Sequence, residues 1–145
     1  MRTSPTSSPS SPRIWARAIL AAACLAAASA LAEAPAPGSD ETAARAKRGV
    51  FDARARAPCA QIEGEALGIC AVAVARGGDG RATVVATFAN GFSRTLHFAG
   101  GAFLRANATM SGVGTDIDWR LEEGVHRIRV DDQRFELPDA LLFGG

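Results

Sequence analysis

The sequence has few of the residues from which catalytic and metal sites are usually built. Its 145 residues include two histidines, three cysteines and no tyrosine. Neither histidine, His97 or His126, has the further ligands that a zinc site requires. The sequence also lacks a calcium-binding loop, a G-x-S-x-G nucleophile motif and a G-K-[ST] phosphate loop. We therefore expect no metal, no cofactor and no catalytic residue of these classes.

No hydrophobic run is long enough to cross a membrane. The stretch 19–32 is rich in Ala and Leu, but its roughly 15 apolar residues fall short of the ~20 that a bilayer requires. Three arginines precede it and small residues end it, an order that predicts a signal peptide over residues 1–32, cleaved after Ala32. Cleavage would leave no stable membrane insertion. Lipid attachment at Cys24, which small residues precede, is the alternative.

Basic charge is not in excess once the signal peptide is removed. All 15 acidic residues lie after Ala32, where 13 of the 16 basic residues remain, so the net charge there is −2. This balance gives no electrostatic reason to expect a nucleic acid partner.

Only two cysteines, Cys59 and Cys70, remain after Ala32. Outside the cytoplasm an even pair is expected to form a disulfide bond. Their spacing is not the C-x-x-C of thioredoxin-like redox sites, so a structural disulfide is favoured. The signal peptide and the disulfide together predict a periplasmic or secreted protein.

Composition divides the exported part of the chain in two. Residues 33–58 are rich in Ala, Pro and charged residues, and Val50 and Phe51 are their only large apolar side chains. Such a segment buries too little surface to offset its ordering entropy, which predicts a disordered or partly helical linker. We assign residues 59–145 to one β domain.

Alternating apolar and polar residues, with frequent turn residues, follow from residue 69 onward. This pattern is typical of an antiparallel all-β domain. It predicts a single meander of six to seven short strands, closed into a small barrel or folded into a compact sandwich. Residues 139–143 are predicted to form one helical turn whose large apolar side chains plug the open end of the sheet.

The turns determine which residues face each other. A two-residue turn at Asn90-Gly91 sets Val85 opposite Leu96, and an even count through the preceding turn sets Val72 opposite Val85. The other face, which would be partly covered or a shallow exposed patch, is then lined by small side chains: Ala71, Ala73, Val84 and Ala86.

Two later turns, Glu123-Gly124 and Asp131-Asp132, are also predicted to have even length. They pair Ile128 with Trp119 on one side and with Phe135 on the other. The result is one apolar face and one face of alternating charges, whereas odd turns would place arginines in the core.

The long glycine-containing stretch between the two hairpin blocks is the best candidate for a recognition surface. The alternative interpretation of this stretch is a mobile surface loop without a binding role. The residues assigned to this possible recognition loop are Asn107, Met110, Ser111, Gly112, Gly114 and Asp116.

The absence of a catalytic motif favours a non-enzymatic exported β module with a macromolecular binding role. Its partner would be a protein or a component of the cell envelope. The alternative is a small hydrolase or ligand-binding protein that uses His126 or His97 with Asp116 or Asp118, which requires these groups to converge in a cleft. His126 falls on the apolar side of its strand, where a structural role is the default.

The C-terminal residues 134–145 read R-F-E-L-P-D-A-L-L-F-G-G. This ending resembles an uncharacterised family of small exported proteobacterial proteins with the pattern R-[FY]-E-[IL]-P-D-A, an aliphatic pair and F-G-G. The resemblance extends upstream over residues 82–88 and 95–98. It implies export and a β domain, and it carries over no catalytic residue.

Overall fold

A computed structural model describes residue 5 and the ranges 39–108 and 116–145. The predicted signal peptide, apart from residue 5, and residues 33–38 of the predicted linker lie outside these ranges. No helix within the described ranges is both long enough and apolar enough to span a membrane.

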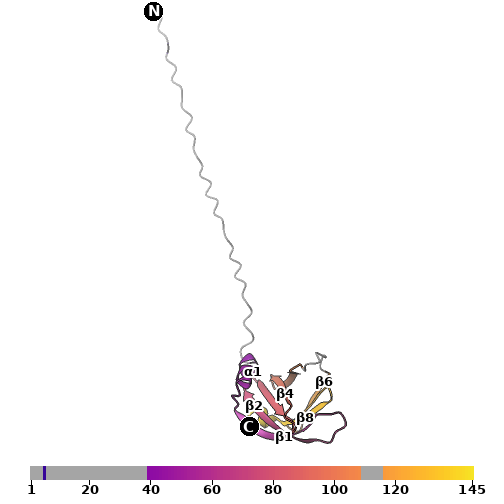
Figure 1. Cartoon of the computed structure of the whole chain (residues 1–145). Coiled ribbons are helices and arrows are strands. Elements are labelled where there is room, and N and C mark those ends of the chain that lie inside the picture. Colours follow the sequence, from indigo (N-terminus) through magenta and orange to yellow (C-terminus); the bar gives the residue numbers. More distant parts are fainter. Residues whose placement is uncertain (1–4, 6–38, 109–115) are drawn as a thin grey trace, which may run out of the picture. The chain divides into compact units, whose positions relative to one another are not determined.

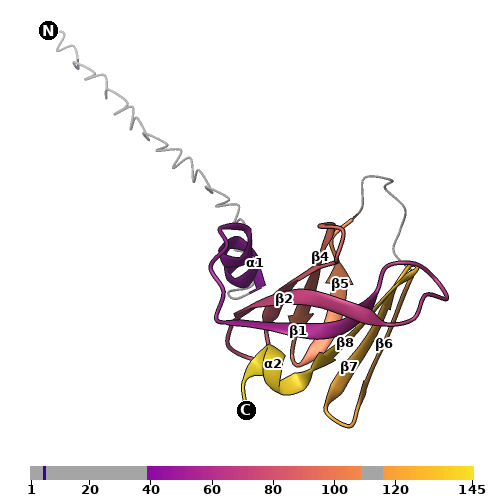
Figure 2. The same ribbon diagram turned by 60° about the horizontal axis from the view of Figure 1, so that its bottom comes forward.

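Eight antiparallel strands form one sheet that curls into a nearly closed barrel (Figures 1 and 2). The spatial order is β5-β4-β3-β2-β1-β8-β7-β6, so β5 and β6 are the edges. This confirms the all-β prediction, with a barrel rather than a sandwich and with eight strands instead of six or seven. The strands are β1 (Ala53–Ala60), β2 (Gly68–Arg76), β3 (Ala82–Thr87), β4 (Ser93–Ala99), β5 (Ala102–Ala106), β6 (Ile117–Glu122), β7 (Val125–Val130) and β8 (Gln133–Pro138).

The helix α1 (Ser39–Lys47) agrees with the partly helical form of the predicted linker. Residues 53–58 differ from that prediction, because they belong to β1. Strand β1 lies between β2 and β8. Its alanines alternate with arginines, and only the alanine side faces the core, where Ala57 is 1% exposed. The neighbouring strands β2 and β8 supply large core side chains, such as Val74 and Phe135. The inward side chains of β1 can therefore be small, and the strand forms although it has few large apolar residues.

The disulfide between Cys59 and Cys70 is present, as predicted. It joins β1 to β2, with 5.8 Å between the two Cα atoms, and both side chains are buried in the core. Such a bond is typical of proteins that function outside the reducing cytoplasm.

The predicted register of the first hairpins is wrong by one residue. In the structure Val74 faces Val84 and Val84 faces Leu96, and all three side chains are fully buried. The core face of β3 therefore carries Val84 and Ala86, whereas Val85 faces outward.

The cause is an odd length in both loops, Gly78-Asp79-Gly80 between β2 and β3 and Ala89-Asn90-Gly91 between β3 and β4. The N–H of Gly91 bonds to the carbonyl of Phe88, and the N–H of Phe88 bonds to the carbonyl of Phe92. Gly91 adopts a φ of 87°, the left-handed residue of a three-residue loop with a bulge. The dipeptide Asn90-Gly91 is thus compatible with a two-residue loop and with a three-residue loop, and the prediction assumed two residues.

The C-terminal register is confirmed. Ile128 faces Trp119 across β6–β7 and Phe135 across β7–β8. Ile128 and Phe135 are buried, and Trp119 is half-buried. The short helix α2 (Asp139–Phe143) follows β8 as predicted, and its Leu142 is fully buried in the core.

One buried charge interrupts the apolar interior. The side chain of Arg94 on β4 is 1% exposed, and its Nη2 lies 3.7 Å from Oδ2 of Asp131. Neither Nε nor Nη2 of Arg94 has a hydrogen-bond partner among the described residues. Burial lowers the pKa of Arg94, and the Asp131 carboxylate partly offsets this effect.

We expect Asp131→Asn to lower the free energy of unfolding by about 1–2 kcal/mol, because it leaves the buried Arg94 charge without a counter-ion. Asparagine keeps the side-chain shape and tolerates the φ of 52° found at this residue. Arg94→Met should be neutral or stabilising, because it removes the buried charge itself. Urea unfolding measures both effects, and a greater loss for Arg94→Met than for Asp131→Asn would contradict this account.

Candidate binding groove

His126 is completely buried and both of its ring nitrogens are used. Trp119 donates its indole N–H to Nδ1 at 3.1 Å, and Nε2 lies 2.8 Å from Oδ1 of Asp139. Because an indole N–H can only donate, Nδ1 must accept, and the ring proton is on Nε2. Aromatic edges from Phe98 and Phe143 pack against the ring. The geometry is that of a structural histidine that ties β6, β7 and α2 together.

The other groups named for a hydrolase are also engaged elsewhere. The carboxylate of Asp116 accepts hydrogen bonds from Arg129, and Asp118 is an exposed residue that faces Arg129 across β6–β7. His97 lies 3.4 Å from the hydroxyl of Thr83 through Nδ1. Burial, and then the charge of Arg105, lower the pKa of His97. The structure thus does not bring either histidine together with Asp116 or Asp118 by any hydrogen bond that it describes.

Two of the predicted recognition-loop residues are described, and both have local structural partners. Asn107 exchanges hydrogen bonds with the backbone of Thr95 through its N–H and its side-chain oxygen. The N–H of Asp116 donates to Oδ1 of Asp131. Met110, Ser111, Gly112 and Gly114 lie outside the described residues.

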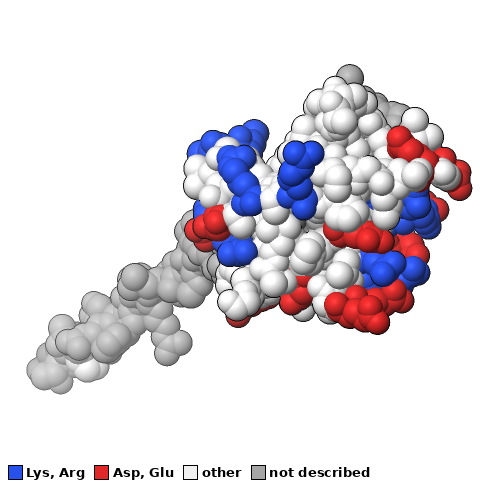
Figure 3. All heavy atoms as spheres, turned by 90° about the horizontal axis from the view of Figure 1, so that it is seen from below, with Lys and Arg blue, Asp and Glu red and all other residues white. Residues whose placement is uncertain are grey.

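Charges are distributed unequally over the barrel. On β6 and β7, Arg120, Arg127 and Arg129 each form an ion pair with an acidic side chain, as Arg127 does with Glu122 and Glu136. Arg134 on β8 instead donates to the backbone carbonyl of Glu65. Seen from below, the side on which β1 lies in Figure 1, basic groups predominate on the left, with an acidic group beside them, and basic and acidic groups alternate on the right (Figure 3). The exposed basic residues that form no ion pair with a described acidic residue include Lys47, Arg48, Arg54 and Arg56.

Arg54 and Arg56 border a shallow depression on the outer face of β1, β2 and β3, which we call the β1–β3 groove. Strand register places two parallel rows of side chains across this face. Each row begins with an arginine of β1 and continues with an alanine of β2. The rows are Arg54, Ala73, Val85 and Thr95, and Arg56, Ala71, Thr87 and Ser93.

The small side chains of β2 make the groove. Alanine is depleted in strands because it packs poorly on a pleated surface, so two outward alanines on a central strand leave the sheet backbone thinly covered. Three adjoining hollows of about 220, 340 and 270 Å³ share lining residues and run along this face. Their lining includes Phe51, Arg54, Arg56, Ile69, Ala71, Ala73, Val85, Thr87, Phe88 and Ala89.

Apolar groups are also accessible along the groove. Ile69 is 48% exposed where the second and third hollows meet, and Ile62 at the far end is 64% exposed. At the other end the guanidinium of Arg54 lies 4.9 Å from the ring centroid of Phe51. The groove therefore offers positive charge near Arg54 and Arg56 and apolar contact along its length. An acidic side chain, Glu65, lines the far end, where it accepts the backbone N–H groups of Gln61 and Ile62.

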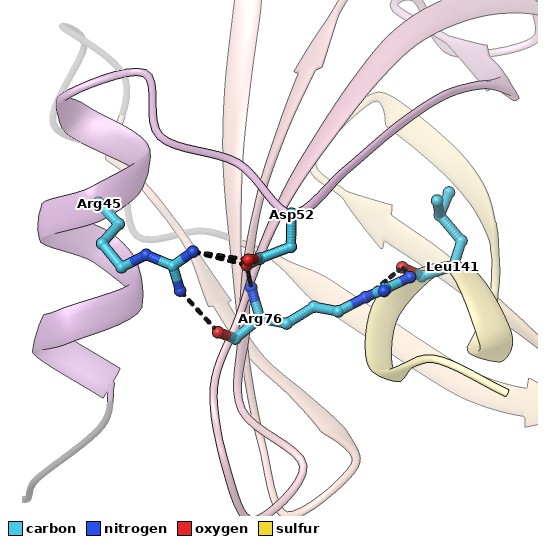
Figure 4. A network of polar contacts seen from close by, with 4 residues as sticks. All are labelled: Arg45, Asp52, Arg76 and Leu141. Atoms are coloured by element: carbon cyan, nitrogen blue, oxygen red, sulfur yellow. Dashed lines mark hydrogen bonds and ion pairs between the residues drawn. The ribbon is translucent and has the colours of Figure 1, made fainter.

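A polar network fixes the end of the groove at Phe51. Both carboxylate oxygens of Asp52 accept hydrogen bonds from Arg45 of α1, and Oδ2 also accepts the backbone N–H of Arg76 (Figure 4). Arg76 in turn donates to the carbonyl of Leu141 in α2. The network holds α1, β2 and α2 around the residue that precedes β1, so the start of β1 has a defined position.

No protein-family model, curated protein sequence or solved structure matches this chain. The resemblance of its C-terminal sequence to a family of exported proteins therefore stays an expectation.

Sequence reasoning did not identify the groove. It expected small outward residues on this face, and it named Ala71 and Ala73 correctly. It missed the arginines because it assigned β1 to a linker. The available signal was the strict alternation of Ala and Arg over residues 53–57, which has the period of a strand.

We predict that nitrogen NMR of the His126 ring shows the Nε2–H tautomer in the native protein. Trp119→Phe should remove this constraint and lower the free energy of unfolding by about 1–3 kcal/mol, because it leaves Nδ1 buried without a donor. A native protein with the proton on Nδ1 would contradict the hydrogen-bond assignment.

The Asp52 network predicts a pH-dependent stability. Hydrogen bonds from Arg45 and then from the backbone of Arg76 hold the pKa of Asp52 below its ordinary value of 3.8. The contribution is fully present above that ordinary value and is lost as the pH falls through the lower pKa of the folded protein. The thermal midpoint of the native protein should thus exceed that of Asp52→Asn at neutral pH and approach it in acid. A difference that does not change with pH would contradict this role.

Proposed function

We propose that this protein is an exported, non-enzymatic β module that binds an acidic polypeptide segment in the β1–β3 groove. The proposal rests on one observation. Arg54 and Arg56 are exposed, have no acidic partner among the described residues and stand beside a floor of alanines. The arginines of β6 and β7, in contrast, form ion pairs with acidic side chains.

The spacing of the two arginines favours an extended ligand. They lie two residues apart on one strand, which separates their Cα atoms by roughly 6.6 Å. Alternate residues of an extended peptide have the same spacing and the same direction. Carboxylates at every second position of a bound segment would therefore face both guanidinium groups, which bind carboxylates with directional, charge-assisted hydrogen bonds.

The floor of the groove favours a peptide over a compact anion. The alanines allow a second backbone to approach the sheet closely, and the intervening side chains of the ligand would contact Val85, Ile69 and Phe88. A long groove with charge at one end and apolar groups along its length matches an amphipathic extended segment.

A periplasmic or secreted location belongs to this proposal. The disulfide indicates a compartment outside the cytoplasm, and the N-terminal sequence has the order of charged, apolar and small residues expected of a signal peptide. The partner would then be an exported or envelope-anchored protein with an acidic extended segment.

A labelled peptide with glutamate at alternate positions, separated by valine and threonine, tests the groove by fluorescence anisotropy. We expect the double variant Arg54→Gln/Arg56→Gln to weaken binding by about tenfold or more, because two charge-assisted contacts are lost. Ala71→Phe should weaken binding similarly without any change of charge, because it fills the groove.

The matched control is Arg105→Gln/Arg127→Gln, which removes the same charge from exposed positions outside the groove. It should change affinity by no more than about twofold at physiological salt. An equal loss in the control would mean that net charge alone attracts the peptide. Equal binding of a peptide of the same composition with its glutamates contiguous would contradict the spacing argument.

A further inference from the structure

Strand β6 presents an open edge. Among the described residues it pairs only with β7, and its register with β7 is regular over the whole strand. The N–H of Asp131 bonds to the carbonyl of Asp116, so even-numbered residues in this ladder face β7. The backbone groups of the odd-numbered residues Ile117, Trp119 and Leu121 consequently point away from the sheet.

The edge is apolar as well as unpaired. Ile117 is 42% exposed and Leu121 is 48% exposed, although the sequence predicted an apolar face turned to the interior. Natural edge strands are commonly protected by proline, charged side chains (lysine above all), a bulge or short length. The charged side chains of β6, Asp118, Arg120 and Glu122, alternate with its apolar ones and so lie on the other face of the strand. The six residues of β6 contain neither proline nor lysine, and their ladder has no bulge. Such an edge is a template for another strand.

The sequence of β6 is complementary to itself. In an antiparallel pair of two β6 strands centred on Trp119, Ile117 faces Leu121 of the second copy, and Asp118 faces Arg120 of the second copy. Because the pair is two-fold symmetric, each of these two contacts occurs twice. Apolar residues then meet apolar residues, and Asp118 meets Arg120 on the other face. At each end of the paired segment Asp116, which precedes β6, faces Glu122 of the second copy.

The neighbouring registers match the apolar side chains less completely, because a centre at Asp118 leaves Leu121 opposite no residue of β6 and a centre at Arg120 leaves Ile117 opposite none. A centre at Asp118 opposes that residue to itself, and a centre at Arg120 opposes two arginines and sets Asp118 opposite Glu122. Like charges directly opposite each other are unfavourable in a sheet. All three registers join odd-numbered residues, whose backbone groups are free, so hydrogen bonding permits each of them and the match of the apolar side chains selects the Trp119-centred one.

We propose that two copies of this protein associate through antiparallel pairing of β6, centred on Trp119, into a symmetric dimer. Each copy uses the same strand, so the interface closes and does not propagate. The inference is independent of the β1–β3 groove, which involves other strands.

Charge reversal tests the register by sedimentation velocity over a range of protein concentrations. The single variants Asp118→Arg and Arg120→Asp each set like charges opposite one another in both symmetric contacts. We expect each to raise the dimer dissociation constant by about tenfold or more. An equimolar mixture of the two variants restores opposite charges in both contacts, so it should form a heterodimer with an affinity within about threefold of the native dimer.

The matched control is Arg127→Asp on β7, which has the same charge change one strand away from the edge and should alter dimer affinity by less than about threefold. Thermal unfolding of each variant establishes that it is folded. A native protein that stays monomeric, single variants that dimerise as the native protein does, or a mixture of folded variants that stays monomeric would each overturn the proposal.

Discussion

The pairing of β1 with both β2 and β8 is the contact on which the barrel depends. Strands β1 to β5 form one meander and β6 to β8 form another, and among the described residues the pairing of β1 with β8 is the hydrogen-bonded junction between the two. The junction with β8 consists of two residue pairs, Cys59 with Phe135 and Ala60 with Arg134. The disulfide anchors β1 to β2 at this same point. The disulfide thus fixes β1 beside β2 at the place where β1 meets β8, and the buried ring of Phe135 packs in the core there.

Strand β1 also determines where unpaired positive charge lies on the surface. Inward alanines of β1 close the core, and the outward arginines between them carry charge that no described acid neutralises. On β6 to β8 the alternation instead produces cross-strand ion pairs, which satisfy the surface internally. The protein therefore has one face whose charges are available to a partner, one face whose charges are matched, and an apolar edge at β6.

Sequence patterns were sufficient where turn length was unambiguous. At the Glu123-Gly124 turn only an even loop length was acceptable, because a shift of one residue would have buried arginines. The even length in turn predicted the pairing of Trp119 with Ile128. At Asn90-Gly91 either parity kept apolar residues inside, so nothing in the sequence distinguished Val84 from Val85 as the core residue. The β1–β3 groove was missed because alanine-rich composition outweighed the alternating period of β1, and the exposure of Ile117 and Leu121 depends on tertiary closure that local periodicity does not encode.

Hydrogen exchange at single residues tests the central role of β1 most directly. The native protein should protect the amides of β1 that face β2 as strongly as those of β2 itself, and the amides at the junction with β8 should share that protection. Exchange of residues 53–60 at the rate of an unstructured chain would show that this segment is a linker, and the barrel junction and the β1–β3 groove would both be contradicted.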